Sequence, residues 1–187
     1  MRSLSLVITI VLALFFSVGT AQSLSGQAPA RDGFFIGFGV GGGSLGLEGQ
    51  GDTELGGAGY FKIGGALNDN VLLGAEGAGW SKEMREGGAS GTLTFSNLNA
   101  VFYGYLDPTG GFFIKSGLGI AVLSAEARFG NVSITESENG VSFTAGVGYD
   151  IGFGARFGLT PHVDYHYAGF EDGRINLIRL GLGFNWY

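Results

Sequence analysis

The stretch RINLIRLGLGFNWY, residues 174–187, decides the fold class of this chain. From residue 180 on, its even positions carry large apolar side chains, whereas its odd positions carry small or polar ones. Successive side chains of a β-strand point to opposite faces, so the stretch predicts a strand with one apolar and one small or polar face. The apolar face holds Leu180, Leu182, Phe184 and Trp186, and the other face holds Arg179, Gly181, Gly183 and Asn185.

Similar alternating pieces recur along the whole chain. The sequence contains 38 Gly, 16 Phe and only 3 Pro, and each Gly costs a helix interior ~1 kcal/mol relative to Ala. Short alternating segments joined by alternately long and short connections are typical of a transmembrane barrel. We therefore predict an all-β fold, a single eight-stranded antiparallel up-and-down β-barrel. The predicted strands are about 33–43, 55–66, 71–80, 92–106, 112–123, 141–151, 158–167 and 174–187, and the predicted long loops are 44–54, 82–90, 129–140 and 169–174.

The N-terminal segment predicts the compartment. Arg2 precedes a short apolar run, 4–16, and the small residues Ser17, Gly19 and Ala21 follow it. This order is typical of a cleaved secretory signal peptide, 1–21; a membrane anchor is the alternative, but the run is shorter than the ~20 residues that span a bilayer. We expect 22–32 to be a periplasmic lead-in and 33–187 to be the barrel domain. The chain has no Cys, which excludes disulfides and a lipoprotein anchor.

Charged side chains inside the predicted strands share one orientation. All lie on the face opposite the larger apolar side chains, and a Lys or Arg facing lipid at mid-membrane would cost ~2–4 kcal/mol. We therefore predict that they point into the barrel and form an ion-pair network. The hairpins are expected to set Lys62 across from Glu76 and Arg179 near Asp164. The predicted network comprises Lys62, Glu76, Lys115, Asp150, Asp164 and Arg179.

The aromatic side chains gather near the ends of the predicted strands. Those that face lipid are expected to form interfacial girdles. Tyr60, Tyr103 and Tyr105 lie on the inner face, where they would fill the space that inward glycines leave.

The outer connections carry acidic charge that equals the net charge of the chain, −6. An acidic rim disfavours nucleic acid and other anionic partners. The simplest interpretation of these charges is that they keep the rim solvated and soluble.

One strand carries candidates for chemistry. His162, Asp164 and His166 share a face, and imidazole and carboxylate groups suit zinc or a similar metal. The favoured alternative is that both histidines are interior polar residues, hydrogen-bonded within the barrel. We predict no cofactor, no metal site and no catalytic residue, and we keep His162 and His166 as weak site candidates.

The C-terminal pattern formed by Arg179, Gly181, Phe184 and Trp186 resembles the signal strand of bacterial outer-membrane β-barrels. The segments 33–43, 96–107 and 113–122 also look like the family of small eight-stranded outer-membrane barrel proteins. This resemblance implies a location in the bacterial outer membrane and recognition of the last strand by the barrel-assembly machinery. It also implies outer-membrane lipid as a partner, and we expect a monomer.

A second resemblance concerns activity. His166-Tyr167-Ala168 resembles the His-x-Ser motif of outer-membrane lipid A deacylases, but Ala168 has no hydroxyl to activate. The sequence therefore favours a non-enzymatic barrel with a structural or surface-interaction role. A barrel enzyme acting on lipid, a narrow porin-like channel and a soluble secreted β-protein remain as alternatives.

Overall fold

The computed structural model describes residues 28–187 except 49–52, 87–88, 130–131 and 154. No helix within the described residues is long and apolar enough to cross a bilayer. The predicted signal peptide lies outside the described residues. The strands are β1 (Phe34–Leu47), β2 (Thr53–Asn68), β3 (Val71–Glu86), β4 (Ala89–Tyr105), β5 (Phe112–Phe129), β6 (Val132–Tyr149), β7 (Ile151–Phe153), β8 (Phe157–Gly169) and β9 (Arg174–Trp186).

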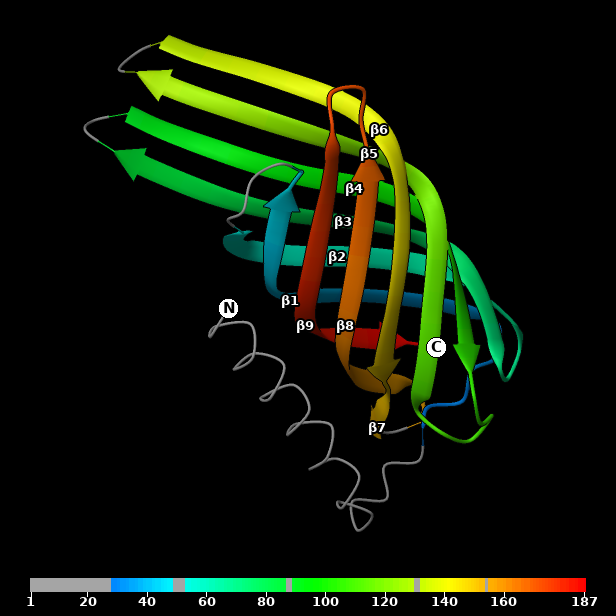
Figure 1. Ribbon diagram of the computed structural model, residues 1–187. Helices are drawn as coiled ribbons and strands as arrows, with labels where there is room; N and C mark the ends of the chain where they lie inside the picture. Colours follow the sequence, from blue (N-terminus) through cyan, green and yellow to red (C-terminus); the bar gives the residue numbers. More distant parts are fainter. Residues whose placement is uncertain (1–27, 49–52, 87–88, 130–131, 154) are drawn as a thin grey trace.

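The strands form a closed antiparallel barrel (Figure 1). Neighbours in sequence pair with each other, and β1 pairs with β9 through partners such as Phe38 and Phe184 to close the sheet. The short β7 continues β6 in the same register against β8. The interruption falls where Pro161 of β8, which has no backbone N–H, stands in that register opposite Tyr149. The predicted eight-stranded up-and-down barrel is therefore confirmed.

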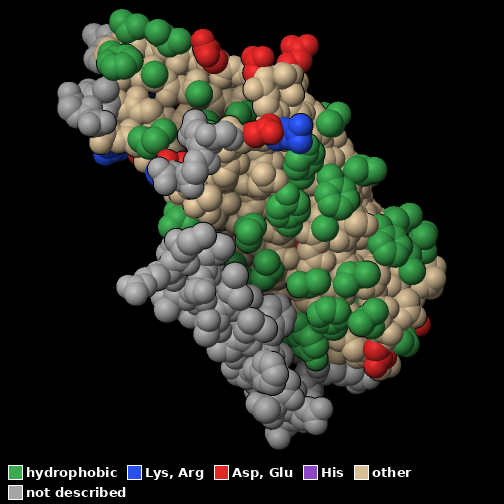
Figure 2. Space-filling model, in the orientation of Figure 1, with side chains coloured by type: hydrophobic (Ala, Val, Ile, Leu, Met, Phe, Trp, Pro, Cys, Tyr) green, Lys and Arg blue, Asp and Glu red, His purple; other side chains and the backbone are tan. Residues whose placement is uncertain are grey.

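The two faces of the barrel wall follow the predicted pattern. All six charged residues of the predicted network are buried. Side chains predicted to face lipid are exposed, for example Leu118 at 68% and Leu182 at 50%. Figure 2 shows hydrophobic side chains spread over the outside of the barrel wall. An apolar exterior around a charged interior is the arrangement of a protein whose outer solvent is lipid.

Three layers of side chains fill the lumen. The end with the short turns, here called the turn end, holds an aromatic cluster that includes Phe35, Tyr103 and Phe113. The opposite end, here called the loop end, holds a second cluster that includes Trp80 and Phe95. Buried charged groups that include Glu76, Lys115, Asp164 and Arg179 lie between these clusters, as expected for a small barrel whose interior is occupied by side chains.

Two predicted loops are strands, which corrects the sequence interpretation. Of the predicted loop 82–90, residues 82–86 complete β3 and 89–90 begin β4; of the predicted loop 129–140, residues 132–140 belong to β6. Clusters of charged, Ser and Gly residues suggested loops, yet the alternation of side chains continues through them. β5 and β6 have 18 residues each, well beyond the ~9–11 that a tilted strand needs to cross a membrane. The outer parts of β3 to β6 project past the other strands as a four-stranded sheet, here called the sheet extension (Figure 1).

Candidate functional site

Four charged side chains from four strands form a closed ring across the lumen. The Lys115 Nζ lies 2.7 Å from Glu76 Oε1 and 3.1 Å from Asp164 Oδ1. The Arg179 Nη2 lies 3.1 Å from Glu76 Oε1 and also binds Asp164 Oδ2. Tyr103 donates a 2.8 Å hydrogen bond from its hydroxyl to Glu76. The ring has no net charge, and each carboxylate contacts two cations, which suits a buried site.

The other two residues of the predicted network lie outside this ring. Lys62 is the cross-strand neighbour of Glu76, but its ammonium lies among aromatic rings, 4.6 Å from the centre of Tyr103. This contact is a cation–π interaction. Asp150 lies near the turn end and accepts hydrogen bonds from four neutral groups. These are the hydroxyls of Tyr105 at 2.7 Å, of Tyr187 at 2.5 Å and of Thr160, and the side-chain amide of Asn185 at 3.1 Å.

Both candidate histidines lie inside the barrel and are buried. The ring nitrogen Nδ1 of His162 lies 3.2 Å from the carbonyl oxygen of Thr160. Nδ1 of His166 lies 2.9 Å from the side-chain amide of Asn97. Among the described residues, no group of three or more His, Cys, Asp or Glu side chains is arranged to hold a metal ion. Ala168 is fully buried in the apolar cluster at the loop end.

The lead-in before the barrel contributes a buried side chain that the sequence did not reveal. Arg31 lies under the turn end, and its Nη2 donates to the carbonyl oxygens of Asp107, Pro108 and Gly110 at 2.8–3.2 Å. Its Nε donates to the backbone carbonyl oxygen of Asp69 at 3.2 Å. One guanidinium therefore joins the β2–β3 turn to the β4–β5 turn. A polar segment without periodicity gives no signal for such an anchor.

The side chains of the last residues are distributed between the outer face of the barrel wall and the lumen. Phe184 and Trp186 are exposed on the outer wall at 47% and 41%. Tyr187, the residue beyond the predicted signal, is instead buried in the lumen at the turn end. Arg179 and Gly181 occupy the inward face of the same strand, and Arg179 belongs to the charged ring.

The two faces of the sheet exchange polarity where the sheet leaves the barrel. In the barrel, the outward row contains Leu98, Ile120 and Val141, all exposed. Farther along the same face the rows become polar, and the opposite face becomes apolar. The outer face of the sheet extension holds Ser81, Glu83, Arg85, Ser90, Thr92, Thr94, Ser124, Glu126, Arg128, Ser133, Thr135 and Ser137. Apolar side chains of its inner face are Met84, Leu93, Ala125, Ala127, Phe129, Val132 and Ile134.

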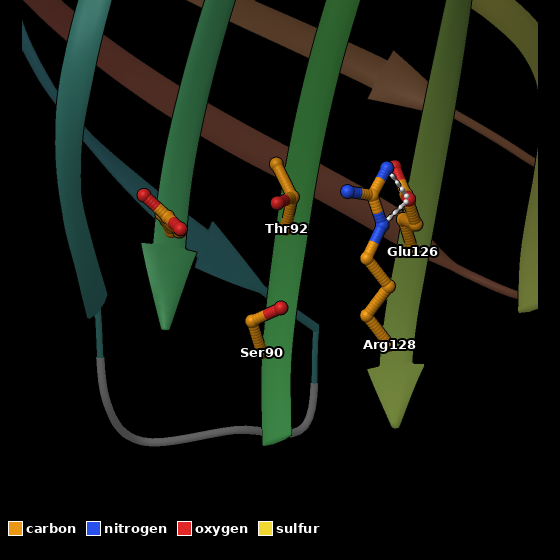
Figure 3. A pocket seen from close by; sticks show the side chains of 5 residues that line it. Ser90, Thr92, Glu126 and Arg128 are labelled. Atoms are coloured by element: carbon orange, nitrogen blue, oxygen red, sulfur yellow. Dashed lines mark hydrogen bonds and ion pairs between the residues drawn. The ribbon is translucent and has the colours of Figure 1, made fainter. Parts of the chain in front are cut away.

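A shallow pocket of ≈ 110 Å³ lies on the outer face of the sheet extension (Figure 3). It is lined by Glu83, Ser90, Thr92, Glu126 and Arg128. Hydrogen bonds from the Ser133 hydroxyl and from Arg128 lower the pKa of Glu126 below its ordinary value. The pocket is therefore polar, and its charges are already paired.

A larger open pocket of ≈ 410 Å³ lies at the loop end, below the sheet extension. Its apolar lining comes from Leu47, Leu123, Phe170 and Ile175, and its charged lining comes from Glu48, Glu138, Asp172 and Arg174. Arg174 pairs with Glu48 at 3.4 Å. The two charged lining residues outside this ion pair, Glu138 and Asp172, are both acidic. The pocket continues the apolar inner face of the sheet extension.

No family model matches the sequence, and no curated protein matches it. Solved structures match its fold. The chain is similar to Ail, the attachment invasion locus protein of Yersinia pestis, with a TM-score of 0.63 and 16% identity over 83% of this chain and 100% of that one. It is also similar to Neisserial surface protein A, with a TM-score of 0.59 and 14% identity over 83% of this chain and 97% of that one.

The closed barrel, its apolar wall and these two likenesses define the class of protein. The chain is a small eight-stranded β-barrel of the bacterial outer-membrane type, which confirms the predicted resemblance at the level of fold. The predicted location in the bacterial outer membrane agrees with this fold.

Proposed function

We propose that this protein is a non-enzymatic outer-membrane barrel that presents the sheet extension at the cell surface for interaction with other molecules. The observation that carries the proposal is the length of β3 to β6. They extend well past the wall that lipid requires and keep strand pairing to their last described residues. A barrel with a purely structural role would need only short connections here.

The filled lumen favours this role over a channel. The charged ring ties β3, β5, β8 and β9 together across the axis, and an apolar cluster lies on each side of it. An ion entering from the loop end would have to pass Trp80 and Phe95, which are 1% and 0% exposed. We therefore expect no stable open current from the purified barrel.

The enzyme alternative finds little support in the same residues. His162 and His166 are buried, and Ala168 stands where a deacylase-like motif would carry its hydroxyl. A barrel enzyme would also need a path for lipid to these imidazoles. A lipid A deacylation assay on the purified barrel tests this alternative, with a His166→Ala variant as the inactive control. If the wild-type barrel shows no turnover, the alternative is removed.

The comparisons suggest surface interaction but not the same ligand. The name of Ail refers to attachment, and Ail has been solved in complex with the heparin analogue sucrose octasulfate. This chain has a net charge of −6, and Glu138 and Asp172 line the larger open pocket at the loop end. We therefore infer that its partners are not polyanions. We further propose that Phe184 and Trp186 serve the barrel-assembly machinery during insertion.

Cysteine labelling tests the proposed orientation. The chain has no Cys, so Ser137→Cys on the sheet extension and Asp69→Cys in a short turn each introduce a single thiol. A membrane-impermeant maleimide added to intact cells should label the first and not the second. Planar-bilayer recordings of the wild-type barrel should show no steady conductance. Labelling only at Asp69→Cys, or a stable open current, would overturn the proposal.

A further inference from the structure

The sheet extension leaves one long strand edge open. Pairing of β6 with β8 begins at Val141 and Gly169, so the described residues supply no partner on that side for 132–140. β5 pairs with the other side of this segment. About half of the backbone N–H and C=O groups of an edge strand point away from the sheet, ready to pair with another chain.

The open edge lacks two of the devices that normally protect such a strand, and its protection comes from the inward-pointing charges of Glu136 and Glu138. Its sequence, VSITESENG, contains neither Pro nor Lys, which are common edge protectors. Val132 and Ile134 are 60% and 57% exposed. They extend the apolar inner face of the sheet to its border. The edge therefore combines unpaired backbone groups with exposed apolar side chains.

The same edge carries acidic charge. Glu136 and Glu138 lie on the inner face of β6 beside the two apolar residues, in the register that pairs them with β5. The nearby cations have other partners, because Lys82 binds Glu54 and Arg128 binds Glu126. Arg85 pairs with Glu83 at 2.7 Å. No cation of the described residues pairs with Glu136 or Glu138, although Glu138 accepts a 3.1 Å hydrogen bond from the backbone N–H of Asp172. Glu136 is therefore the carboxylate of the edge that is most available to basic groups from outside the chain.

We propose that the β6 edge, residues 132–140, binds an extended basic segment of another protein by strand addition. Main-chain hydrogen bonds would supply affinity, and alternate side chains would supply specificity. The added strand places apolar side chains opposite Val132 and Ile134 and basic side chains opposite Glu136 and Glu138. The proposal rests on the proposed function, since it names the class of partner for the sheet extension.

A second copy of the chain is a poorer occupant than a basic partner. The other open edge, in β3 beyond Ser81, carries Lys82 and Arg85, whose charges are already paired within the molecule. The β6 edge of another copy would bring further carboxylates to the interface. Like charges placed opposite each other on neighbouring strands are destabilising.

Binding of a synthetic peptide to the purified full-length barrel in nanodiscs tests the proposal. The probe is fluorescein-labelled Thr-Thr-Lys-Thr-Lys-Thr-Val-Thr-Val, written for antiparallel pairing, and fluorescence anisotropy gives its affinity. Glu136→Lys should weaken binding at least about tenfold. Asp32→Lys changes the net charge equally at the opposite end of the barrel, so it should leave binding within about twofold. Retained heat-modifiable gel mobility shows that both variants fold.

Two further measurements address strand addition itself. Bound peptide should slow amide hydrogen exchange within 132–140, and a peptide with Pro at its fourth and fifth positions should not bind. The proposal is overturned if the peptide does not bind, if Glu136→Lys and Asp32→Lys have equal effects, or if the edge instead pairs copies of the barrel in cross-linking without peptide. Surface labelling of Ser137→Cys is independent of these results, so failure of the peptide assay leaves the proposed orientation intact.

Discussion

Lys115 on β5 and Glu76 on β3 meet across the lumen, where the Lys115 Nζ lies 2.7 Å from Glu76 Oε1. The two strands are not neighbours, because β4 pairs with both. The ion pair therefore connects side chains over the interior rather than along the sheet. Arg179 completes the link to the far wall through the same carboxylate.

Replacement of Lys115 by Met should destabilise the barrel strongly. The change leaves Glu76 and Asp164 buried with Arg179 as their remaining ion-pair partner within the charged ring. Removing one member of a buried pair typically costs ~3–5 kcal/mol. Urea unfolding in lipid vesicles, followed by tryptophan fluorescence, measures the loss.

The matched control is Lys82→Met at the loop end. Lys82 binds Glu54, but their side chains are 29% and 34% exposed, and such pairs contribute ~0–1 kcal/mol. The control should therefore unfold at nearly the wild-type urea concentration. Equal losses for Lys115→Met and Lys82→Met would show that the charged ring adds no stability of its own.

Adding a methyl group at Gly183 should destabilise the barrel through overpacking. A Cβ at this position would lie 2.0 Å from the Tyr60 hydroxyl, and forced overpacking typically costs ~1–3 kcal/mol. Gly57→Ala is the control, since nothing lies within 4 Å of its added Cβ. Tyr60→Phe removes the clashing oxygen and should restore part of the stability in the double variant. If Gly183→Ala unfolds like Gly57→Ala, the described packing of Tyr60 is wrong.

The faces of the strands could be read from the sequence, because lipid outside and a packed lumen inside make the two sides chemically unequal. The positions of Lys115 and Leu118 follow from this difference alone. The contacts inside could not be read in the same way. Lys62 is opposite Glu76 in register, yet Glu76 reaches Lys115 and Arg179 across the lumen. Strand register determines which backbone positions are neighbours. The contacts of a long side chain in the lumen depend instead on the space that the surrounding side chains leave.

The strand ends were the least predictable part of the fold. Residues 82–90 and 129–140 carry the charges and hydroxyls of typical loops, but they continue the alternation of a strand. The interpretation failed because the polar and apolar faces exchange beyond Leu98 and Ile120, as expected where the outer solvent changes from lipid to water. A search for persistent period-two alternation, regardless of which face is apolar, would have found these extensions.

Replacement of Tyr187 by Phe should weaken the turn end of the barrel. Its hydroxyl donates to Asp150 at 2.5 Å and lies 2.9 Å from the hydroxyl of Tyr105. Hydrogen bonds to charged groups contribute ~1.5–3 kcal/mol, so unfolding should require correspondingly less urea. Tyr165→Phe removes a hydroxyl that bonds Asn176 on the exposed wall and should cost ~1 kcal/mol or less. The assignment of Tyr187 to the lumen is contradicted if Tyr165→Phe is the more damaging change.

Asp107 in the β4–β5 turn should titrate at unusually low pH. The backbone N–H of Thr109 donates to its Oδ1 at 2.8 Å and the Thr109 hydroxyl at 2.9 Å. These bonds favour the carboxylate and lower its pKa from the ordinary value of 3.8. Because the folded-state pKa is the lower one, the stabilisation of the turn is fully present above pH 3.8 and is lost as pH falls through the lowered pKa.

Carboxyl-carbon NMR of the folded barrel can follow this titration directly. Thr109→Val removes the hydroxyl bond and keeps the N–H bond, so the pKa of Asp107 should rise part of the way toward 3.8. Thr109→Ser retains a hydroxyl that can donate to the same oxygen, and it should keep the low pKa. A pKa that is the same in Thr109→Val as in Thr109→Ser would mean that the hydroxyl does not stabilise the carboxylate. The N–H bond of Thr109, with the smaller effects of Gly110 and Arg31, would then account for the lowered pKa, and the turn would keep its pH response in both variants.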